Sequence, residues 1–538
     1  MDRRSLLIMG VSAGALGALE STAWAAAPSD ADRAVRPEDF GGPQAKNSLV
    51  KAMAKAGELG LPLKCQPVDY LIDAPLIPAK GLRWHANGCR VVASTDKSSP
   101  AVRIVNDDVR VHGLLRISLS DPGGQPSANR GHVLVGDWMN GAVAPSGFQF
   151  DDLELDGGHM NCNGFAVAGG ANQIRGNRIH CGDNDRIGRL FLAHWGNFAQ
   201  HNKPGAQYLH VNGYGPTAHP HAISVREVSS GRLSCPTPDF MAVAAISAGY
   251  DIDLGKVSGV IDKPTPAADL VLLTAGDLGF AYATPAERSR GMGGIRIGTV
   301  EGRSSGNGVN RIGMALYRDK DSTPQPADFY FAKIEDTVTR VSVTVTGKSA
   351  AVLAGSNGHG RSRYGTIEAE GGRVCVGIPN FNTDTVIETL RCKRSLTRGV
   401  EIAGAGGDPS AFPRGIQINA VEIDGTDLSG TGAPPNKSGM LIQSAEQVRV
   451  GHVKVASLAP GGYAGVLGTK IKDVQVGDSE LPGNYDPKLG GAWQNVERRP
   501  DVSVGRSLGV NVTNAPNAPN ANPKKNPNEG YLQGLHER

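Results

Sequence analysis

The stretch "NRIHCGDNDRIG", residues 177–188, holds a histidine, two aspartates and an arginine in one polar run between apolar segments. Its two carboxylates, Asp183 and Asp185, could act as the acid and the base of glycoside hydrolysis. The imidazole of His180 and the guanidinium of Arg186 suit a different reaction, in which a base removes a proton from the carbon beside a carboxylate. This run is therefore the first candidate for a catalytic site.

A long segment rich in histidine follows directly, at 193–225. Loops of this length are costly to order and are commonly functional, and aromatic side chains offer surface on which sugar rings can stack. His219 in this segment is a second candidate for a catalytic base. The other side chains of the segment that we expect to bind substrate are His194, Trp195, His201, Tyr208 and His221.

Two basic clusters lie further along the chain. The run "YRDKD", residues 317–321, contributes Arg318 and Lys320, and the run "GHGRSR", residues 358–363, contributes His359 and Arg361. Basic side chains attract an acidic polymer electrostatically. We therefore expect these four side chains to bind substrate as well.

Hydrolysis and elimination make different demands on these residues. If Asp183 and Asp185 both lie in a strand, their Cα atoms are ~6.7 Å apart on one face, which allows the separation that an inverting hydrolase needs. A lyase or an epimerase must instead neutralise the substrate carboxylate and supply a base. Arg186, the "YRDKD" cluster or a Ca²⁺ held by the two aspartates could neutralise it, and His180 or His219 could take the proton. The need for a cofactor stays open, with Ca²⁺ as the candidate.

The same residues also have ordinary structural explanations. Asp, Asn and Gly are typical of tight turns, because their side chains bond to nearby backbone and tolerate left-handed conformations. A His-x-His pair in a loop is commonly solvated surface rather than a metal site. On this explanation Asp183 and its neighbours form the corner of a repeated unit and need no substrate.

The elements that would position these residues repeat along the chain from about residue 100, at intervals of about 20 to 35 residues. Each repeat has a small residue followed by alternating apolar positions, which predicts a β-strand. Stacked coils ~4.8 Å apart bury the apolar faces that single strands cannot, so the recurrence predicts an all-β, right-handed parallel β-helix of about ten coils. The repeated phrases are "IGRLFLAHWG" at Ile187, "LGKVSGVID" at Leu254, "IGTVEGRSSG" at Ile297, "YGTIEAEGG" at Tyr364, "IETLRCKRS" at Ile387, "INAVEIDGTD" at Ile418 and "VGHVKVASL" at Val450.

The segment before the coils contains "RPEDFGG" at Arg36, an amphipathic stretch "NSLVKAMAKAGELGLPLKC" and "VDYLIDAPLIPAKGLRWHANGCRVV" at 68–92. This order resembles the opening of pectate-lyase-like β-helix proteins. The resemblance covers residues 36–92 and implies a helix that caps the N-terminal end, with a glycan as substrate. The usual "GDGxTDDT" of that family is shortened here to "GPQAKNS". Hydrolases of the family carry "DD" and then "GHG" about one coil later, whereas "GHG" stands here at 358–360, so their catalytic set does not transfer directly.

Composition narrows the class of protein. The chain of 538 residues has 72 glycines and 5% aromatic residues, which suits short strands and tight turns. A formal net charge of +3 gives no reason to expect a nucleic-acid partner, although local basic patches are compatible with it. The seven cysteines lack the spacing of a disulfide scaffold and of a zinc site, so we expect most of them to be buried and predict no metal ligands among them.

The first residues resemble a twin-arginine export signal, with ordinary secretory export as the alternative. Arg3 and Arg4 precede the apolar run "LLIMGVSAGALGAL", and the cleavage-like "AWA" follows at 23–25. No other apolar stretch approaches the ~18 residues of a membrane-spanning helix, so we expect no membrane span and a periplasmic or secreted protein. The Asn- and Pro-rich stretch "TNAPNAPNANPKKNPNEG" at 513–530 predicts a disordered tail.

The sequence therefore predicts a signal peptide at 1–25, a cap and first coil at 36–92, a β-helix at 93–510 and a tail at 511–538. The favoured function is a lyase that cleaves a uronate-containing, acidic polysaccharide by β-elimination. Two alternatives stay open: an inverting glycoside hydrolase that uses Asp183 and Asp185, and a non-catalytic glycan-binding or scaffold protein of an exopolysaccharide system.

Overall fold

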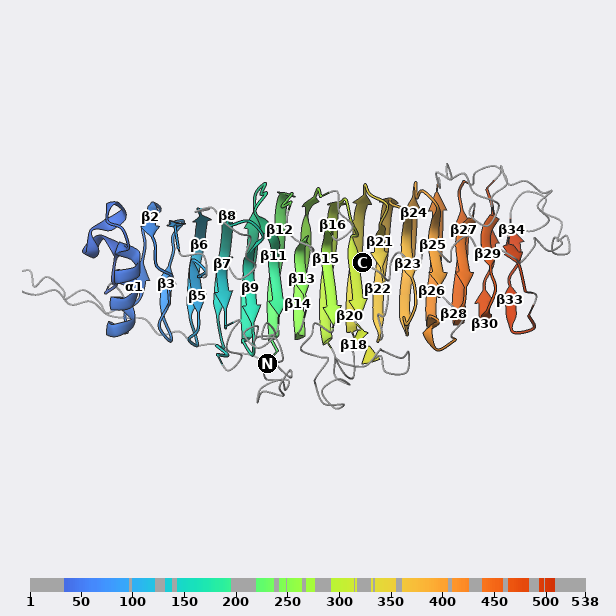
Figure 1. Ribbon diagram of the computed structural model, residues 1–538, viewed down its shortest axis with the longest axis horizontal. Helices are drawn as coiled ribbons and strands as arrows, with labels where there is room; N and C mark the ends of the chain where they lie inside the picture. Colours follow the sequence, from blue (N-terminus) through green and yellow to red (C-terminus); the bar gives the residue numbers. More distant parts are fainter. Residues whose placement is uncertain are drawn as a thin grey trace, which may run out of the picture.

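The computed structural model is an all-β rod with a helical cap at its N-terminal end (Figure 1). The predicted signal peptide and the predicted tail lie outside the residues that the structure describes. The described residues are 33–95, 99–120, 131–137, 143–194, 219–236, 241–247, 249–263, 268–275, 292–313, 315–316, 330–331, 334–354, 360–404, 409–424, 438–457, 463–482, 493–497 and 499–508.

The N-terminal cap forms where the amphipathic stretch predicted a helix. Two short 3₁₀ segments, η1 (Pro37–Phe40) and η2 (Gly42–Gln44), lead into helix α1 (Ser48–Leu59). Leu49, Ala52, Met53 and Ala56 recur at helical spacing and are buried, and α1 packs against the first strands. The helix covers the apolar end of the first coil, as predicted.

Two long parallel sheets make up the rod. Sheet B has 13 strands in strict chain order, and sheet A has 19. The strands of sheet B are β5 (Val102–Ile104), β7 (Gly131–Val135), β9 (Cys162–Ala168), β11 (Ile187–His194), β13 (Met241–Ile246), β15 (Ala268–Ala275), β17 (Val309–Gly313), β21 (Ala350–Leu353), β23 (Val374–Ile378), β25 (Arg398–Ala403), β27 (Ser438–Gln443), β29 (Tyr463–Leu467) and β32 (Trp493–Asn495).

The strands of sheet A are β1 (Leu63–Lys64), β2 (Asp69–Ile72), β3 (Arg83–His85), β4 (Arg90–Ala93), β6 (Arg110–Leu119), β8 (Gln149–Gly157), β10 (Asn172–Cys181), β12 (His221–Leu233), β14 (Tyr250–Ile261), β16 (Met292–Ser304), β20 (Ile334–Val345), β22 (Ser362–Gly371), β24 (Thr385–Lys393), β26 (Arg414–Asp424), β28 (Ala445–Val455), β30 (Ile471–Val476), β31 (Ser479–Glu480), β33 (Val502–Val504) and β34 (Ser507–Leu508). A short antiparallel pair, β18 (Ala315–Leu316) and β19 (Tyr330–Phe331), and the 3₁₀ segment η5 (Pro409–Ala411) complete the described elements.

The chain alternates between the two sheets, and each strand pairs in parallel with its equivalent one coil away. This arrangement is a parallel β-helix, as predicted from the repeats. The 13 strands of sheet B exceed the expected ten or so coils and give a rod of about 60 Å at ~4.8 Å per coil. The sequence pattern underestimated this number because some coils lack the marker residue; β20, for example, has Thr339 in its place.

The marker residue lies at a bend of sheet A. The register aligns Gly255 with Gly298, and it aligns Gly365 in turn with Glu388 in the next coil. In β14 the alternation of buried and outward residues breaks after Leu254, with two outward residues in succession, so the strand turns there. A Cβ on Gly298 would lie 2.2 Å from the carbonyl oxygen of Gly255, a close approach that explains the glycine.

The bend divides sheet A into two walls. We call the part before the bend the first wall; it contains β1, β3, β30, β33 and the N-terminal portions of the long strands. The part after the bend is the second wall; it contains β2, β4, β31, β34 and the C-terminal portions. The phrase at Ile187 had been aligned with this row, but it belongs to β11 in sheet B.

The interior of the rod is mostly apolar but includes a buried ion pair. Stacked rings of Phe148, Phe165 and Phe191 line successive coils. Further along, the guanidinium Nε of Arg311 lies 3.0 Å from Asp336, and both side chains are fully buried. Burial raises the pKa of the Asp336 carboxyl against the opposing effect of Arg311.

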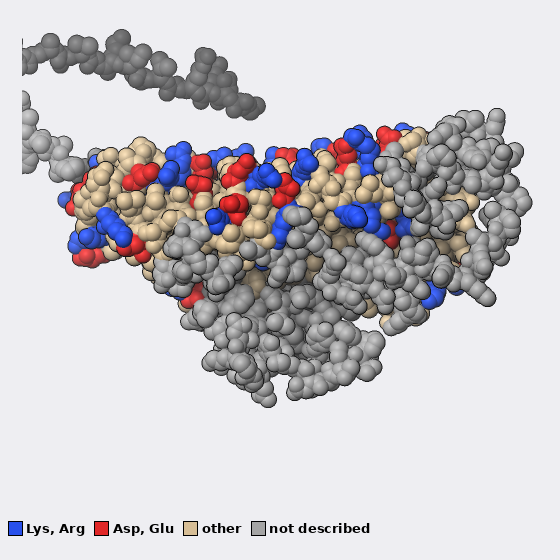
Figure 2. Space-filling view, turned by 45° about the horizontal axis from the view of Figure 1, so that its top comes forward, with Lys and Arg blue, Asp and Glu red and all other residues tan. Residues whose placement is uncertain are grey.

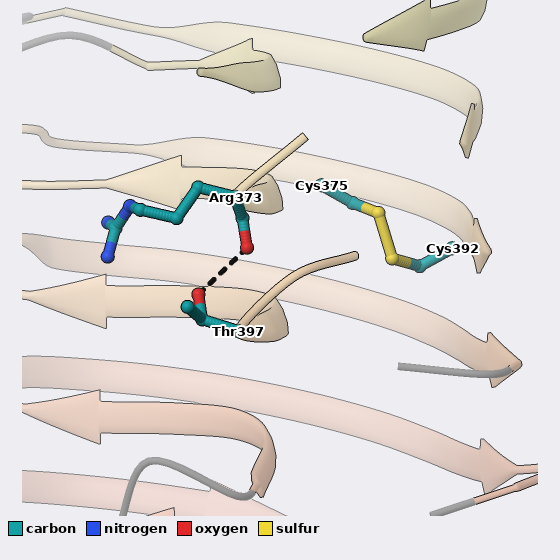
Figure 3. Close-up of a disulfide and its surroundings, with 4 residues drawn as sticks. All are labelled: Arg373, Cys375, Cys392 and Thr397. Atoms are coloured by element: carbon teal, nitrogen blue, oxygen red, sulfur yellow. Dashed lines mark hydrogen bonds between the residues drawn. A yellow bond between two sulfur atoms is a disulfide. The ribbon is translucent and has the colours of Figure 1, made fainter. Parts of the chain in front are cut away.

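The cysteines are all buried, and two of them form a disulfide that the sequence did not predict. Cys375 on β23 and Cys392 on β24 are joined across the interior between the two sheets (Figure 3). Nearby, the Thr397 hydroxyl donates to the Arg373 carbonyl at 2.8 Å, which ties neighbouring coils together. The remaining five cysteines are free thiols in the core, as expected for most of them. Within the described ranges, no helix has the length and apolar character required to cross a membrane.

Candidate functional site

The polar run that opened the sequence analysis forms the corner between β10 and β11. Asn184 holds this corner together: its Nδ2 donates to the Gly157 carbonyl, and its Oδ1 accepts the backbone N–H groups of Arg186 and Ile187, all at 2.8 Å. Asp183 and Asp185 are both exposed and lie in the turn rather than in a strand. The strand spacing considered for a pair of catalytic carboxylates therefore does not apply to them.

The Asp183 side chain has a structural role in the contact between two coils. Its Oδ1 accepts the backbone N–H of Arg232 in the next coil at 2.8 Å, and a Cβ on Gly231 would collide with that oxygen. The same arrangement recurs near the C-terminal end of the rod, where Asp478 accepts the backbone N–H of Arg506 at 2.8 Å beside Gly505. A Gly-Asp pair followed one coil later by Gly-Arg is thus a repeated corner device, which accounts for Asp183 without a substrate.

Asp185 and Arg186 lie beside each other at the same corner. The Nε of Arg186 is 3.4 Å from Asp185 Oδ1, and the aspartate side chain is largely exposed. An ion pair of this kind in water contributes little to stability, so either group can be exchanged for a ligand at small cost. The structure thus brings these two predicted residues together with Asp183, two to five residues beyond the end of β10.

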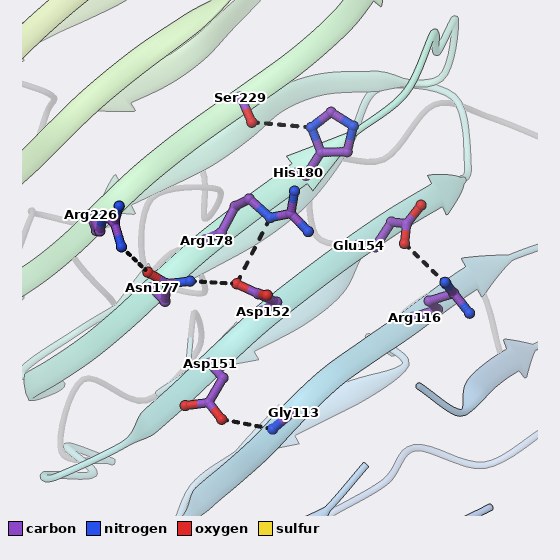
Figure 4. A network of polar contacts seen from close by, with 10 residues as sticks. All are labelled: Gly113, Arg116, Asp151, Asp152, Glu154, Asn177, Arg178, His180, Arg226 and Ser229. Atoms are coloured by element: carbon purple, nitrogen blue, oxygen red, sulfur yellow. Dashed lines mark hydrogen bonds and ion pairs between the residues drawn. The ribbon is translucent and has the colours of Figure 1, made fainter. Parts of the chain in front are cut away.

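His180 lies on the outer face of the second wall, near the end of β10. Its side chain is half-buried, and Nδ1 lies 3.1 Å from the hydroxyl oxygen of Ser229 on β12 (Figure 4). When Nδ1–H donates to Ser229, Nε2 carries the lone pair, as a general base requires. Among the described residues, no hydrogen bond or ion pair uses His180 Nε2.

Two arginines accompany His180 on this face (Figure 4). Arg178 precedes it by two residues on β10, so both side chains point outward from the same strand. Its Nε is 3.8 Å from Asp152 Oδ1, a carboxylate that also accepts a hydrogen bond from Asn177 at 2.7 Å. The arginine–aspartate contact is therefore loose, and another carboxylate could take the aspartate's place.

The second arginine, Arg116 on β6, lies two coils from His180. Its Nε donates to Glu154 Oε2 at 3.0 Å, and Glu154 is the register partner of His180 on β8. Sequence reasoning missed Arg178, Arg116 and Ser229 as companions of His180. The alternation within "NRIHC" could have identified Arg178, but the other two come from strands whose register no local pattern reveals.

The histidines of the long segment that the structure describes lie far from His180. His221 begins β12 opposite Asn172, the first residue of β10, whereas His180 pairs near the end of that strand with Ser229. His219 is buried and stacks on Tyr250 with ring centroids 5.8 Å apart, and its carbonyl lies 3.0 Å from His221 Nδ1. His194 is buried at the end of β11 in sheet B. These three histidines are therefore also distant from the corner at Asp183.

Arg361 is the remaining predicted residue that the structure describes, and it is exposed just before β22. The other predicted substrate-binding residues lie outside the described ranges: Trp195, His201, Tyr208, Arg318, Lys320 and His359.

The described carboxylates give no support for a metal site. In the ranges that the structure describes, no group of three or more His, Cys, Asp and Glu side chains is placed to hold a metal ion. A second buried carboxyl with a raised pKa is Asp269 on β15, where burial raises the pKa to about 6 against hydrogen bonds from Asn310 and Asn307. Its oxygens are fully used by these amides, so it is a structural group of sheet B.

Charged side chains of both signs are interspersed along the exposed part of the rod (Figure 2). On the second wall most of them are matched between coils. Lys256 pairs with Glu301, and Glu368 lies between Arg340 and Arg391 at 2.7 and 2.9 Å. These two arginines lower the pKa of Glu368. The charges of these second-wall residues are therefore balanced between neighbouring coils.

The chain matches no family model, and neither curated proteins nor solved structures show a significant similarity to it. The parallel β-helix therefore rests on the strand pairing described above, and the resemblance to pectate-lyase-like proteins remains confined to the sequence pattern of residues 36–92.

Proposed function

We propose that this protein is an exported polysaccharide lyase that cleaves a uronate-containing chain by β-elimination on the second wall of sheet A. The observation that carries the proposal is the placement of His180, whose Nδ1 contacts Ser229 while Nε2 is available beside Arg178. A β-helix face also suits an extended polymer, because equivalent side chains recur every ~4.8 Å along it. The periplasmic or secreted location is part of the proposal and is supported by Arg3 and Arg4 before the apolar run.

The reaction assigns a role to each group. Arg178 would neutralise the uronate carboxylate and thereby acidify the proton on the adjacent carbon. His180 Nε2 would take that proton, the electron pair of the broken C–H bond would form a carbon–carbon double bond, and the glycosidic oxygen would leave with the other fragment. Ser229 would hold the imidazole in the required tautomer. The imidazolium of His180 would then give that proton to the leaving oxygen, directly or through water, so atoms and charge balance and the base is regenerated.

A test follows from the double bond that elimination leaves in the product. The purified protein is incubated with polyuronates, and unsaturated ends are followed by their ultraviolet absorbance. Replacing His180 by Ala should lower the rate by roughly 10²–10⁴-fold, the usual contribution of a general base. The matched control is His452→Ala, which removes an exposed histidine paired with Glu480 elsewhere on the same wall and should leave the rate unchanged. Equal rates for wild type and His180→Ala would refute the assignment.

A second candidate is a non-catalytic glycan-binding protein. It is favoured by the corner role of Asp183, which removes one member of the carboxylate pair from the candidate chemistry. Retained polymer binding with neither unsaturated nor reducing ends would support it. Reducing ends without the absorbance would instead support the hydrolase, and a folded Asp183→Ala variant of full activity would exclude Asp183 from any reaction.

A further inference from the structure

The first wall of the N-terminal coils carries a row of arginines with an unusual environment. Arg83 on β3 is the register partner of Arg110 on β6, Arg110 is opposite Gln149 on β8, and Gln149 is opposite Arg175 on β10. All three arginines are exposed. We call this row of four residues the arginine column.

Among the residues that the structure describes, no carboxylate pairs with the arginine column. Within the described residues, none of the three guanidinium groups makes an ion pair or a hydrogen bond. Of the acidic residues nearest in sequence, Asp151 lies two residues after Gln149 and accepts the backbone N–H of Gly113 at 2.7 Å, and Asp107 pairs with Lys80 at 3.1 Å. Like charges directly opposite each other in neighbouring strands are destabilising, so this stacking costs free energy unless something binds to it.

A second row, of one lysine and two histidines, runs beside the column on the same wall. Lys64 is opposite His85, and His85 is opposite His112, with the two imidazole rings stacked at 5.1 Å between centroids. His85 and His112 each follow a column arginine by two residues, so their side chains share its face. Burial, followed by the neighbouring His112, lowers the pKa of His85, so the cationic charge of this wall lies mainly on the column arginines and Lys64.

We propose that the arginine column binds a linear acidic polysaccharide laid along the axis of the rod, with its carboxylates on Arg83, Arg110 and Arg175. This inference takes its substrate class from the proposed function and adds the surface that would hold the substrate. The column extends over about 14 Å at ~4.8 Å per coil, close to the length of three extended sugar residues. Arg175 lies on β10, the strand that also carries His180, so the column leads to the candidate site.

The spacing favours a polysaccharide over a nucleic acid. Arginines on successive coils meet one acidic group per sugar, whereas DNA carries one charge per ~1.7 Å of its axis and calls for a denser cationic surface. The slight net charge of +3 agrees with a local track of this kind. Arginine is also suited to the task because its planar fork matches a carboxylate with two hydrogen bonds.

The test compares two triple variants with the same change of net charge. The column variant is Arg83→Gln, Arg110→Gln and Arg175→Gln. The control variant is Arg340→Gln, Arg391→Gln and Arg394→Gln, which removes three exposed arginines of the second wall that pair with Glu368 or Glu370. Binding of polygalacturonate to the full chain is measured by calorimetry at two salt concentrations, with circular dichroism to show that both variants are folded.

The column variant should bind about thirtyfold more weakly, roughly threefold for each lost guanidinium, and its affinity should depend less on salt. The control variant should stay within about threefold of wild type, since its arginines are already neutralised. Equal losses in both variants, or no loss in the column variant, would overturn the proposal. Single-stranded DNA that binds as tightly as the polyuronate, with the same dependence on the column, would overturn the choice of ligand.

Failure of the binding proposal can be distinguished from failure of the proposed lyase activity. If the column variant loses affinity but the wild-type protein produces no unsaturated ends, the binding surface is supported and the lyase activity is refuted. If the wild-type protein is a lyase and the column variant cleaves with an unchanged KM, the lyase activity is supported and binding by the column is refuted.

Discussion

The two walls of sheet A present arginines of the same coils in different surroundings. On the second wall each of these arginines lies opposite or near a carboxylate of a neighbouring coil, at 3.0 to 3.8 Å. On the first wall each faces another arginine or a glutamine. The second-wall residues are Arg90, Arg116 and Arg178, and the first-wall residues are Arg83, Arg110 and Arg175.

The difference shows that register, rather than composition, decides which charges can receive a ligand. All six arginines contribute equally to the net charge, yet three of them are neutralised within the protein. In a β-helix each side chain is stacked on its equivalents one coil away, so a carboxylate at the matching position of the next coil is enough to occupy an arginine. A row without such a carboxylate stands out as a binding surface.

The largest expected effect comes from the bend that separates the walls. Replacing Gly298 by Val places a side chain against the carbonyl oxygen of Gly255 and should lower the free energy of unfolding by about 3 kcal/mol. The control is Thr339→Val in the next coil, where a β-branched residue already occupies the same row, and it should change stability by less than about 0.5 kcal/mol. Urea denaturation measures both, and equal stabilities would contradict a close approach at the bend.

A single charge reversal should make the first wall resemble the second. Arg110→Glu places a carboxylate beside Arg83, so we expect at least a tenfold loss of polyuronate affinity, about 1.4 kcal/mol. Arg303→Glu makes the same change of charge on the second wall, away from the column, and should cost less than about threefold. An equal loss of polyuronate affinity in both variants, measured by calorimetry, would contradict the difference between the two walls.

The reverse change should give the second wall a ligand-accessible arginine. Glu154→Gln removes the partner of Arg116 next to His180, and we expect polyuronate affinity to rise about twofold to threefold. The free energy of unfolding should fall by less than about 1 kcal/mol, because exposed ion pairs contribute little. An affinity that stays at the wild-type value would mean that pairing does not limit binding on this wall.

The smallest effect concerns the pH dependence of the second-wall pairs. Arg340 and Arg391 lower the pKa of Glu368 in the folded protein, so its contribution is present above its ordinary pKa of 4.5 and is lost as pH falls through the lowered value. At pH 7 the free energy of unfolding of wild type should exceed that of Glu368→Gln by well under about 1 kcal/mol, and the difference should be smaller at pH 3. Urea unfolding at the two pH values tests this, and a difference that grows on acidification would reverse the expected sign.

The sequence predicted the fold because its evidence was local and repeated. Alternating apolar residues specify a strand, and Gly255, Gly298 and Gly365 recur for the same steric reason at the bend. The helical spacing of Leu49, Ala52 and Met53 likewise required no knowledge of the coils. Local patterns do not say which sheet a strand joins, which is why the phrase at Ile187 was aligned with the wrong sheet.

The site was harder to predict because it depends on contacts between coils. Asp183 looked like a catalytic carboxylate, but it accepts a backbone hydrogen bond from a residue far along the chain. The partners of His180 come from β6 and β12, whose register depends on the lengths of the loops between coils. The disulfide joins Cys375 to Cys392 for a similar reason, since the two lie on facing sheets of one coil. Such contacts follow from the assembled rod and not from any short stretch of sequence.

The central claim is that the arginine column of the first wall is the main binding surface for an acidic polysaccharide. Chemical footprinting of arginines tests it most directly: the full chain is modified with phenylglyoxal with and without polygalacturonate, and each arginine is quantified by mass spectrometry. The account predicts that the polymer protects Arg83, Arg110 and Arg175 and leaves Arg340, Arg391 and Arg394 as reactive as before. Protection of the second-wall set with none on the column would contradict it.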